Sequence, residues 1–208
     1  MMKSLFWLLL LALPLTHPQW ELKQNKEGIK LYTRVEEGHP LKAIKIETVF
    51  NVPLETCIAV LRDIDHLDEL FPDVSKVAKV KQDETSQIHY LHLEAPWPVA
   101  DRDGSFGLNY TYDAKTQTVN IEAKMVVDVY PVQAGIIRLN KGHGNWKFKR
   151  IDATHTSLEY YFLGDPGGSI PAWLANSVIE ESPFKMMQNF HRLVKLERYQ
   201  GKKFNFIK

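Results

Sequence analysis

The feature that most constrains the fold is one long helical pattern near the carboxyl end, entered through a forced turn. The turn spans residues 165–171 and contains two glycines and two prolines. Glycine adopts positive φ, and proline fixes φ and lacks an amide donor, so the chain must bend there. From Pro171 to about Tyr199 the pattern is helical, and Pro183 inside it predicts a kink. One stripe of this helix comprises Ala175, Val178, Ile179, Ser182, Met186, Phe190 and Leu193.

Short alternating segments precede this helix and indicate strands. We expect strands at 28–34, 43–50, 75–82, 86–94, 101–112, 118–130, 135–140, 144–150 and 157–163. The segment 20–26 is polar with helical character, and 54–64 repeats apolar residues at helical spacing. Short turns between consecutive strands indicate an antiparallel sheet, so the fold class is α+β, with a long helix laid across a curved sheet.

Length and charge narrow the function classes. The chain has 208 residues, which suits one domain, and 44 % of them are apolar, which is enough for a sizeable core. The formal net charge is +1, so there is no electrostatic case for a nucleic-acid partner or for strong adhesion to anionic membranes. Neither a nucleophile-elbow sequence nor a zinc-protease, phosphate-loop or dinucleotide-binding motif is present.

The amino-terminal residues predict a signal peptide. Lys3 supplies a positive start, and 5–15 is an apolar run that is too short to span a bilayer, which needs roughly 20 apolar residues. We therefore expect a signal peptide at 1–18, one domain at 19–208, and an exported, periplasmic protein. The cleavage site falls loosely between Pro14 and Gln19, and an uncleaved anchor stays open as an alternative.

The candidate metal ligands and the cysteine have simpler interpretations. Cys57, the single cysteine, lies in a helical pattern and is expected to be a buried, inert thiol. The acidic segment 63–69 fits the solvated face of a short helix better than a metal site. His89 and His92 fall on opposite faces of a strand, which weakens a zinc interpretation. No metal, cofactor or catalytic residue is expected.

Several segments together carry a resemblance to a known family. Residues 96–103 resemble the P-x-P-(V/L)-x-x-R-D segment of START lipid-transfer domains. Ile137-Arg138 followed by Gly144-x-Trp146 resembles their next signature, and 164–176 resembles the turn into their final helix. Residues 52–63 resemble their early helix. The order is that of the family, and the resemblance covers nearly everything after the signal peptide.

The resemblance implies a helix-grip fold, in which a curved antiparallel sheet wraps the C-terminal helix and leaves a tunnel for one lipid. It also implies carriage or sensing of a phospholipid, sterol or similar lipid without chemistry on the ligand. By analogy, the C-terminal helix and the hairpin tip at 113–117 would form the gate. Leu108 stands where some sterol-binding members place an arginine, so we expect a ligand held mainly by shape.

The expected lipid-binding residues come from four segments. Phe106, Leu108 and Tyr110 share one strand phase, and Tyr90 and His92 share another. The last helix contributes part of its apolar stripe. The full set is Tyr90, His92, Arg102, Phe106, Leu108, Tyr110, Arg138, Val178, Ile179, Ser182, Met186 and Phe190. The alternative is that these side chains pack against each other as ordinary core.

Two arginines allow different interpretations. Arg102, between Asp101 and Asp103, either binds a phosphate headgroup or forms an internal ion pair, and the ion pair is favoured because a buried arginine needs a carboxylate. Arg138 either reaches the tunnel or faces water.

The sequence therefore predicts an exported, monomeric lipid carrier that contacts membranes transiently. One alternative is a helix-grip enzyme, cyclase-like or hydrolase-like, that would use Tyr90, His92 or Arg102 on a hydrophobic substrate. Another is a groove that docks a partner protein.

Overall fold

The computed structural model describes residues 19–171, 174–175 and 177–208. The predicted signal peptide at 1–18 lies outside these residues. The elements along the chain are β1 (Glu21–Lys26), β2 (Ile29–Arg34), β3 (Ala43–Phe50), α1 (Leu54–Arg62), η1 (Ile64–Glu69), β4 (Val74–Gln82), β5 (Ser86–Leu93), β6 (Arg102–Asp113), β7 (Thr118–Val126), β8 (Ile137–Arg138), β9 (Gly142–Arg150), β10 (Thr156–Gly164), η2 (Ser177–Glu181), α3 (Ser182–Leu193) and η3 (Glu197–Tyr199).

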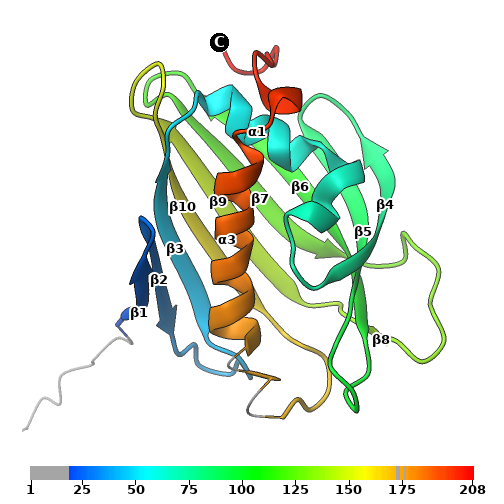
Figure 1. Cartoon of the computed structure of the whole chain (residues 1–208). Coiled ribbons are helices and arrows are strands. Elements are labelled where there is room, and N and C mark those ends of the chain that lie inside the picture. The colour runs from blue at the N-terminus through cyan, green and yellow to red at the C-terminus, as the bar shows by residue number, and fades with distance from the viewer. Residues whose placement is uncertain (1–18, 172–173, 176) are drawn as a thin grey trace, which may run out of the picture.

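One ten-stranded sheet forms the body of the protein. Its order is β1-β2-β3-β10-β9-β7-β6-β5-β4, and every neighbouring pair along this path is antiparallel. The short strand β8 pairs in parallel with the start of β6. Figure 1 shows the sheet curving around α3, with α1 beside the end of that helix. The α+β prediction of a curved antiparallel sheet wrapped around a C-terminal helix is confirmed, and the sheet does not close into a barrel.

The segment expected to have helical character before residue 28 is instead strand β1. It turns into β2 through Glu27 and Gly28, which both have positive φ, at 54° and 76°. Pairing with β2 supplies the backbone hydrogen bonds that a polar, isolated helix would have to make alone. Two expected strands are also shorter: 118–130 ends at Val126, and 135–140 reduces to Ile137–Arg138.

The last helix is less uniform than the sequence predicted. Its long α-helical part is Ser182–Leu193, and a π-helical turn, Ser177–Glu181, precedes it. Pro183 therefore lies in the first turn of α3, where its missing amide proton costs no α-helical hydrogen bond. The change of helix type thus falls one residue before Pro183, the position at which the sequence predicted a kink.

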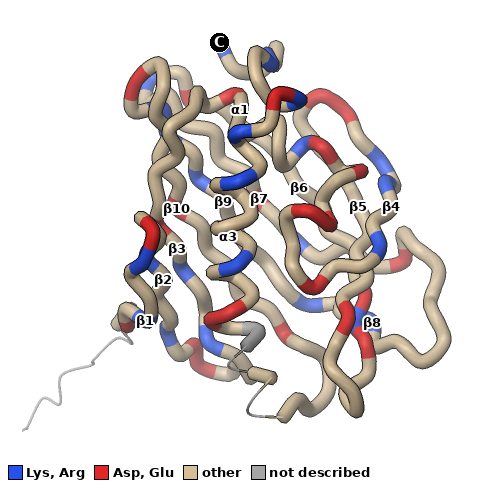
Figure 2. Tube along the Cα trace, viewed as in Figure 1, with Lys and Arg blue, Asp and Glu red and all other residues tan. Residues whose placement is uncertain are grey.

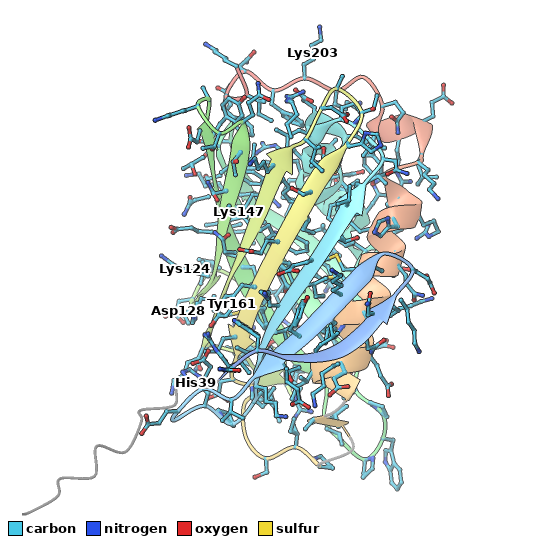
Figure 3. All side chains as sticks on the ribbon, turned by 90° about the vertical axis from the view of Figure 1, so that its left-hand side faces the viewer. His39, Lys124, Asp128, Lys147, Tyr161 and Lys203 are labelled. Carbon is cyan, nitrogen blue, oxygen red and sulfur yellow. The ribbon has the colours of Figure 1, made fainter. Side chains whose placement is uncertain are left out.

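Alternation along the strands decides which side chains meet α3. Lys124, Lys147 and Tyr161 project from the outer face of the sheet, away from that helix (Figure 3). Their chain neighbours Trp146 and Tyr160 point inward and are buried.

Phe190 fixes the second half of α3 to the sheet. Its ring centroid lies 4.8 Å from that of Phe50, 6.0 Å from that of Trp146 and 5.9 Å from that of Phe148. The side chain has no exposed surface. These four rings form what we call the aromatic cluster, and it fills the space between sheet and helix at this level.

Cys57 lies in α1 and is fully buried, as the sequence predicted. Burial raises the pKa of its thiol, mainly because the thiolate would lose its solvation. The thiol is therefore protonated at neutral pH.

The aromatic cluster leads to a stability prediction. Phe190→Ala should lower the free energy of unfolding by about 3–5 kcal/mol, because it removes buried surface and leaves a cavity that the rigid sheet cannot fill. Urea denaturation followed by circular dichroism measures this change. Lys185→Ala, on the exposed side of the same helix, is the control and should change stability by less than about 0.5 kcal/mol. A small effect at Phe190 would show that the cluster does not fix the helix.

Candidate functional site

A cavity of about 320 Å³ lies between the sheet and the start of the last helix. Its wall draws side chains from β3, α1, η1, β5, β6, β7, β9, β10 and the terminal helix, so distant parts of the chain enclose one space. Most of the wall is apolar and includes Ile44, Leu61, Leu67, Leu91, Leu108, Ala123, Met125, Phe162, Ile179 and Met186. The volume lies at the lower end of the range for small-molecule sites.

Six of the expected lipid-binding residues line this cavity: Arg102, Phe106, Leu108, Ile179, Ser182 and Met186. The three from β6 share one face of that strand, as the alternation predicted. The three from the terminal helix come from the π-helical turn and the first part of α3. The side chain of Val178 lies outside the described part of the structure.

Tyr110 and Phe190 lie beyond the cavity, in the filled part of the core. The Tyr110 hydroxyl donates to Gln87 Oε1 at 3.0 Å, and Gln87 Nε2 donates to the Leu61 carbonyl at 2.9 Å. Phe190 belongs to the aromatic cluster. Both side chains are ordinary core residues here, which is the alternative that the sequence left open for them.

Tyr90 and Arg138 lie on the outer face of the sheet, around the carboxylate of Asp103. The Tyr90 hydroxyl donates to Asp103 at 2.9 Å, and Arg138 donates to both carboxylate oxygens at 2.6 and 2.9 Å. Tyr90 also stacks on Tyr130, with the ring centroids 3.7 Å apart. The chain between β7 and β8 thus covers this side of β5, which explains why Tyr90 is buried although it faces away from the cavity.

The Asp103 carboxylate is 1 % exposed and stays charged. Burial alone would raise its pKa, but the hydrogen bonds from Arg138 and Tyr90 hold the pKa below its usual value. Arg138 therefore neither reaches the cavity nor faces water freely. This differs from both interpretations that the sequence left open for it. His92 is on the same outer face, with its Nε2 3.0 Å from Asp101 Oδ2.

Arg102 forms no ion pair at contact distance with a carboxylate among the described residues, so the favoured expectation of an internal ion pair is wrong; its charge is only a minor cause, after the Ala95 amide and His92, of the lowered pKa of Asp101. Its neighbours are engaged elsewhere: Asp101 with His92 and the Ala95 amide, and Asp103 with Arg138. The Arg102 guanidinium donates only to the carbonyl oxygens of Ala100 and Pro166. The residue is 8 % exposed and lines the cavity. A buried cation with only carbonyl partners can still accept an anionic group of a ligand.

His89 is a cavity residue that the sequence did not identify. It sits directly opposite Phe106 on the paired strands β5 and β6, and the two rings are stacked with centroids 6.2 Å apart. It is 3 % exposed, and its Nδ1 has no hydrogen-bond partner in the described chain. Desolvation lowers its pKa to about 4, so the ring is neutral at pH 7. The sequence signal for His89 was the second set of alternate residues in β5, namely Gln87, His89, Leu91 and Leu93. The prediction followed the other set instead, because that set contains the aromatic residue Tyr90.

The mouth of the cavity lies at the end of the sheet where β5, β6 and β10 meet their loops. The loop from β5 to β6 contributes Glu94, Ala95 and Pro96, and the connection from β10 to the terminal helix contributes Asp165, Pro166 and Ile170. Both loops are at the lower end of the molecule in Figure 1. Between Pro96 and Pro98, Trp97 is 91 % exposed.

The hairpin tip at 113–117 is at the opposite end of β6. It joins β6 to β7 next to Arg150, whose amide donates to the Gln117 carbonyl, and it contributes no residue to the cavity wall. The expectation that this tip gates the cavity is therefore wrong.

Charged groups at the mouth are mixed in sign. Besides Arg102, the lining contains Lys42, Lys141, Asp73, Glu94 and Asp165. Figure 2 shows the same interspersion of acidic and basic residues along the rest of the chain. Among the residues that the structure describes, no group of three or more His, Cys, Asp or Glu side chains is arranged to hold a metal ion. No described helix is both long and apolar enough to cross a membrane.

The neutral state of His89 predicts acid sensitivity. The folded state binds this proton with a pKa of about 4, below the ordinary value of 6.5, so the unfolded state binds more protons between these values and stability falls as the pH falls through that window. The titration of His89 alone should lower the free energy of unfolding by about 2 kcal/mol between pH 7 and pH 5. Urea denaturation at both pH values, on the wild type and His89→Leu, measures the difference. Equal pH dependence of the two proteins would contradict a buried neutral ring.

Comparisons with known proteins agree with this geometry. A crystal structure of a STAR-related lipid transfer protein from Xanthomonas axonopodis superposes with a TM-score of 0.77 and is 33 % identical, covering 85 % of this chain and 99 % of that one. An uncharacterised protein of Pseudomonas aeruginosa is 28 % identical over 81 % of this chain and 83 % of its own length. The phosphatidylcholine transfer protein of Rattus norvegicus is 23 % identical over 86 % of this chain and 88 % of its own. The START domain family matches residues 8–200, and the chain belongs to that family.

Proposed function

We propose that this protein binds one amphipathic lipid in the cavity under the terminal helix and carries it between membranes without changing it chemically. The observation that carries the proposal is the apolar cavity of about 320 Å³ at the site where the helix meets the sheet. Membership of the START family and two similar proteins that are named as lipid transfer proteins support it.

The driving force is the removal of the lipid's apolar part from water. Each buried methylene contributes about 0.8 kcal/mol. Ten methylenes thus supply about 8 kcal/mol before the entropy of binding is subtracted. The side chains that would make these contacts are largely leucine, isoleucine, methionine and phenylalanine.

The headgroup would remain at the mouth, near Arg102. Among the described residues this guanidinium hydrogen-bonds only to carbonyl oxygens, so a phosphate or carboxylate of the lipid would give it a directly paired counter-charge. The three basic residues of the mouth, Arg102, Lys42 and Lys141, equal its three acids, Asp73, Glu94 and Asp165, in number, which also suits a zwitterionic headgroup. This orientation places the apolar chain inside the cavity.

The wall of the cavity supports binding rather than catalysis. Nucleophilic catalysis needs a hydroxyl or thiol paired with a base. In the described lining, Ser182 donates its hydroxyl proton to Asp73 at 2.5 Å at the mouth, and His89 has no hydrogen-bonded partner to activate. We therefore propose a carrier, in preference to a hydrolase-like or cyclase-like enzyme.

Trp97 is the side chain that we propose for transient membrane contact. An exposed tryptophan prefers the membrane interface, where its ring is dehydrated and its indole NH stays hydrated. Its position beside the mouth would bring the cavity to the bilayer surface. A monomeric, exported protein in the periplasm fits this role, with the export signal at 1–18.

Native mass spectrometry of detergent-free protein incubated with total bacterial membrane lipids tests the binding function. The wild type should carry one adduct of lipid mass. Met186→Trp should lose most of that adduct, because Met186 lines the cavity and the larger ring would occupy it. Lys185→Trp adds the same ring on the exposed side of α3 and should bind like the wild type. If the wild type carries no adduct, the proposed function is wrong.

Transfer of a fluorescent phospholipid between vesicles tests the membrane contact. Trp97→Ala should slow transfer about tenfold, the effect of withdrawing about 60 Å² of apolar surface from the bilayer at about 25 cal/mol per Å². Binding measured without vesicles should stay unchanged, because Trp97 does not line the cavity. Trp97→Phe, which keeps an aromatic ring, should retain most of the rate. Unchanged transfer by Trp97→Ala would rule out this contact.

A further inference from the structure

Two polar side chains on the same face of β5 have different surroundings. Gln87 is fully buried, and the protein satisfies both ends of its amide, through the Leu61 carbonyl and the Tyr110 hydroxyl. His89, two residues further along the strand, is almost as buried, but its Nδ1 has no hydrogen-bond partner in the described chain. Gln87 does not line the cavity and His89 does, so along β5 the cavity wall begins at His89.

An unpartnered buried imidazole is costly for the fold. Burying a polar group without a hydrogen bond typically costs about 1–3 kcal/mol, and a leucine or phenylalanine at this position would avoid that cost. The surrounding wall is apolar, with Leu61, Leu91 and Leu108 as further lining residues. A partner for His89 must therefore come from whatever occupies the cavity.

We propose that His89 recognises an uncharged hydrogen-bonding group, a hydroxyl or a carbonyl, at the end of the lipid that enters deepest. This inference rests on the proposed lipid-binding function and specifies the class of ligand. A neutral imidazole offers one donor and one acceptor, so it suits a hydroxyl, which can bond to either nitrogen, or a carbonyl oxygen, which accepts from the donor.

The strand register sets the length of such a lipid. His89 pairs with Phe106, and Arg102 is four residues earlier on β6, which corresponds to about 14 Å along the strand. Arg102 is at the mouth and His89 is the β5 lining residue farthest from the mouth loop. The ligand is then polar at both ends, with an anionic group near Arg102 and an uncharged group near His89.

The role proposed for His89 would replace the expectation of a ligand held mainly by shape. That expectation came from Leu108, which stands where some family members place an arginine. Leu108 is opposite Gln87 in the sheet, two pairs further from the mouth than His89 and Phe106. The polar contact inside this cavity thus comes from the neighbouring strand.

The test uses two probes that differ only in a terminal hydroxyl, dodecanoate and 12-hydroxydodecanoate, with affinities measured by isothermal titration calorimetry. The wild type should bind the hydroxylated probe about tenfold more tightly, the effect of one buried hydrogen bond. His89→Leu should abolish or reverse this preference while binding dodecanoate at least as well. His89→Gln, which keeps a donor and an acceptor, should restore part of the preference.

Two further variants separate the contribution of His89 from other effects. Arg102→Gln should weaken both probes alike and leave their ratio unchanged, because it acts on the carboxylate end. His143→Leu, on the exposed side of β9, should change neither affinity. Melting temperatures confirm that each variant is folded.

The outcomes distinguish this inference from the function on which it rests. Equal affinity of the wild type for the two probes, or a preference that survives His89→Leu, overturns the role of His89 and leaves lipid carriage intact. The same holds if neither probe binds to a wild type that carries an adduct from membrane lipids. If the wild type carries no lipid adduct at all, the proposed function falls and this inference falls with it.

Discussion

The structure depends on the contact between one end of α3 and the curved sheet. Phe190 packs among Phe50, Trp146 and Phe148 and fills the space completely at that level. A single helix is too narrow to fill a curved ten-stranded sheet along its whole length. Because the aromatic cluster holds the second half of the helix close, the sheet remains hollow beside its first half, and this hollow is the cavity.

Asp103 on the outer face of the sheet and Arg102 and His89 on the inner face differ in the partners that the protein gives them. On the outer face, Asp103 has both oxygens paired by Arg138 and a further bond from Tyr90, so the fold satisfies its own buried charge. On the inner face, Arg102 and His89 are buried without such partners. Unsatisfied polar groups lower stability. Of the three buried side-chain atoms without a partner in the described chain, His89 Nδ1 belongs to a residue of the cavity wall, whereas Thr33 Oγ1 and Arg62 Nη1 belong to residues that do not line it. For His89, a group bound in the cavity could offset this cost.

The sequence predicted the fold well because its signals were local. Alternating strands with short turns, the 165–171 turn and the amphipathic stripe around Met186 each follow from nearest neighbours along the chain. The β6 face with Phe106 and Leu108 was also predicted correctly as cavity wall.

The errors came from contacts that no local pattern records. Tyr90 is buried by a segment that crosses the outer face some forty residues later, so an aromatic residue marked the wrong phase of β5 and concealed His89. Which carboxylate an arginine pairs with likewise depends on tertiary contacts. Asp103 forms its ion pair with Arg138 and not with its chain neighbour Arg102. If the cavity takes a lipid as proposed, the terminal helix, with its second half fixed by the aromatic cluster, would admit it near Ile179 and Pro183, where the π-helical turn gives way to α3 and the mouth loops meet it.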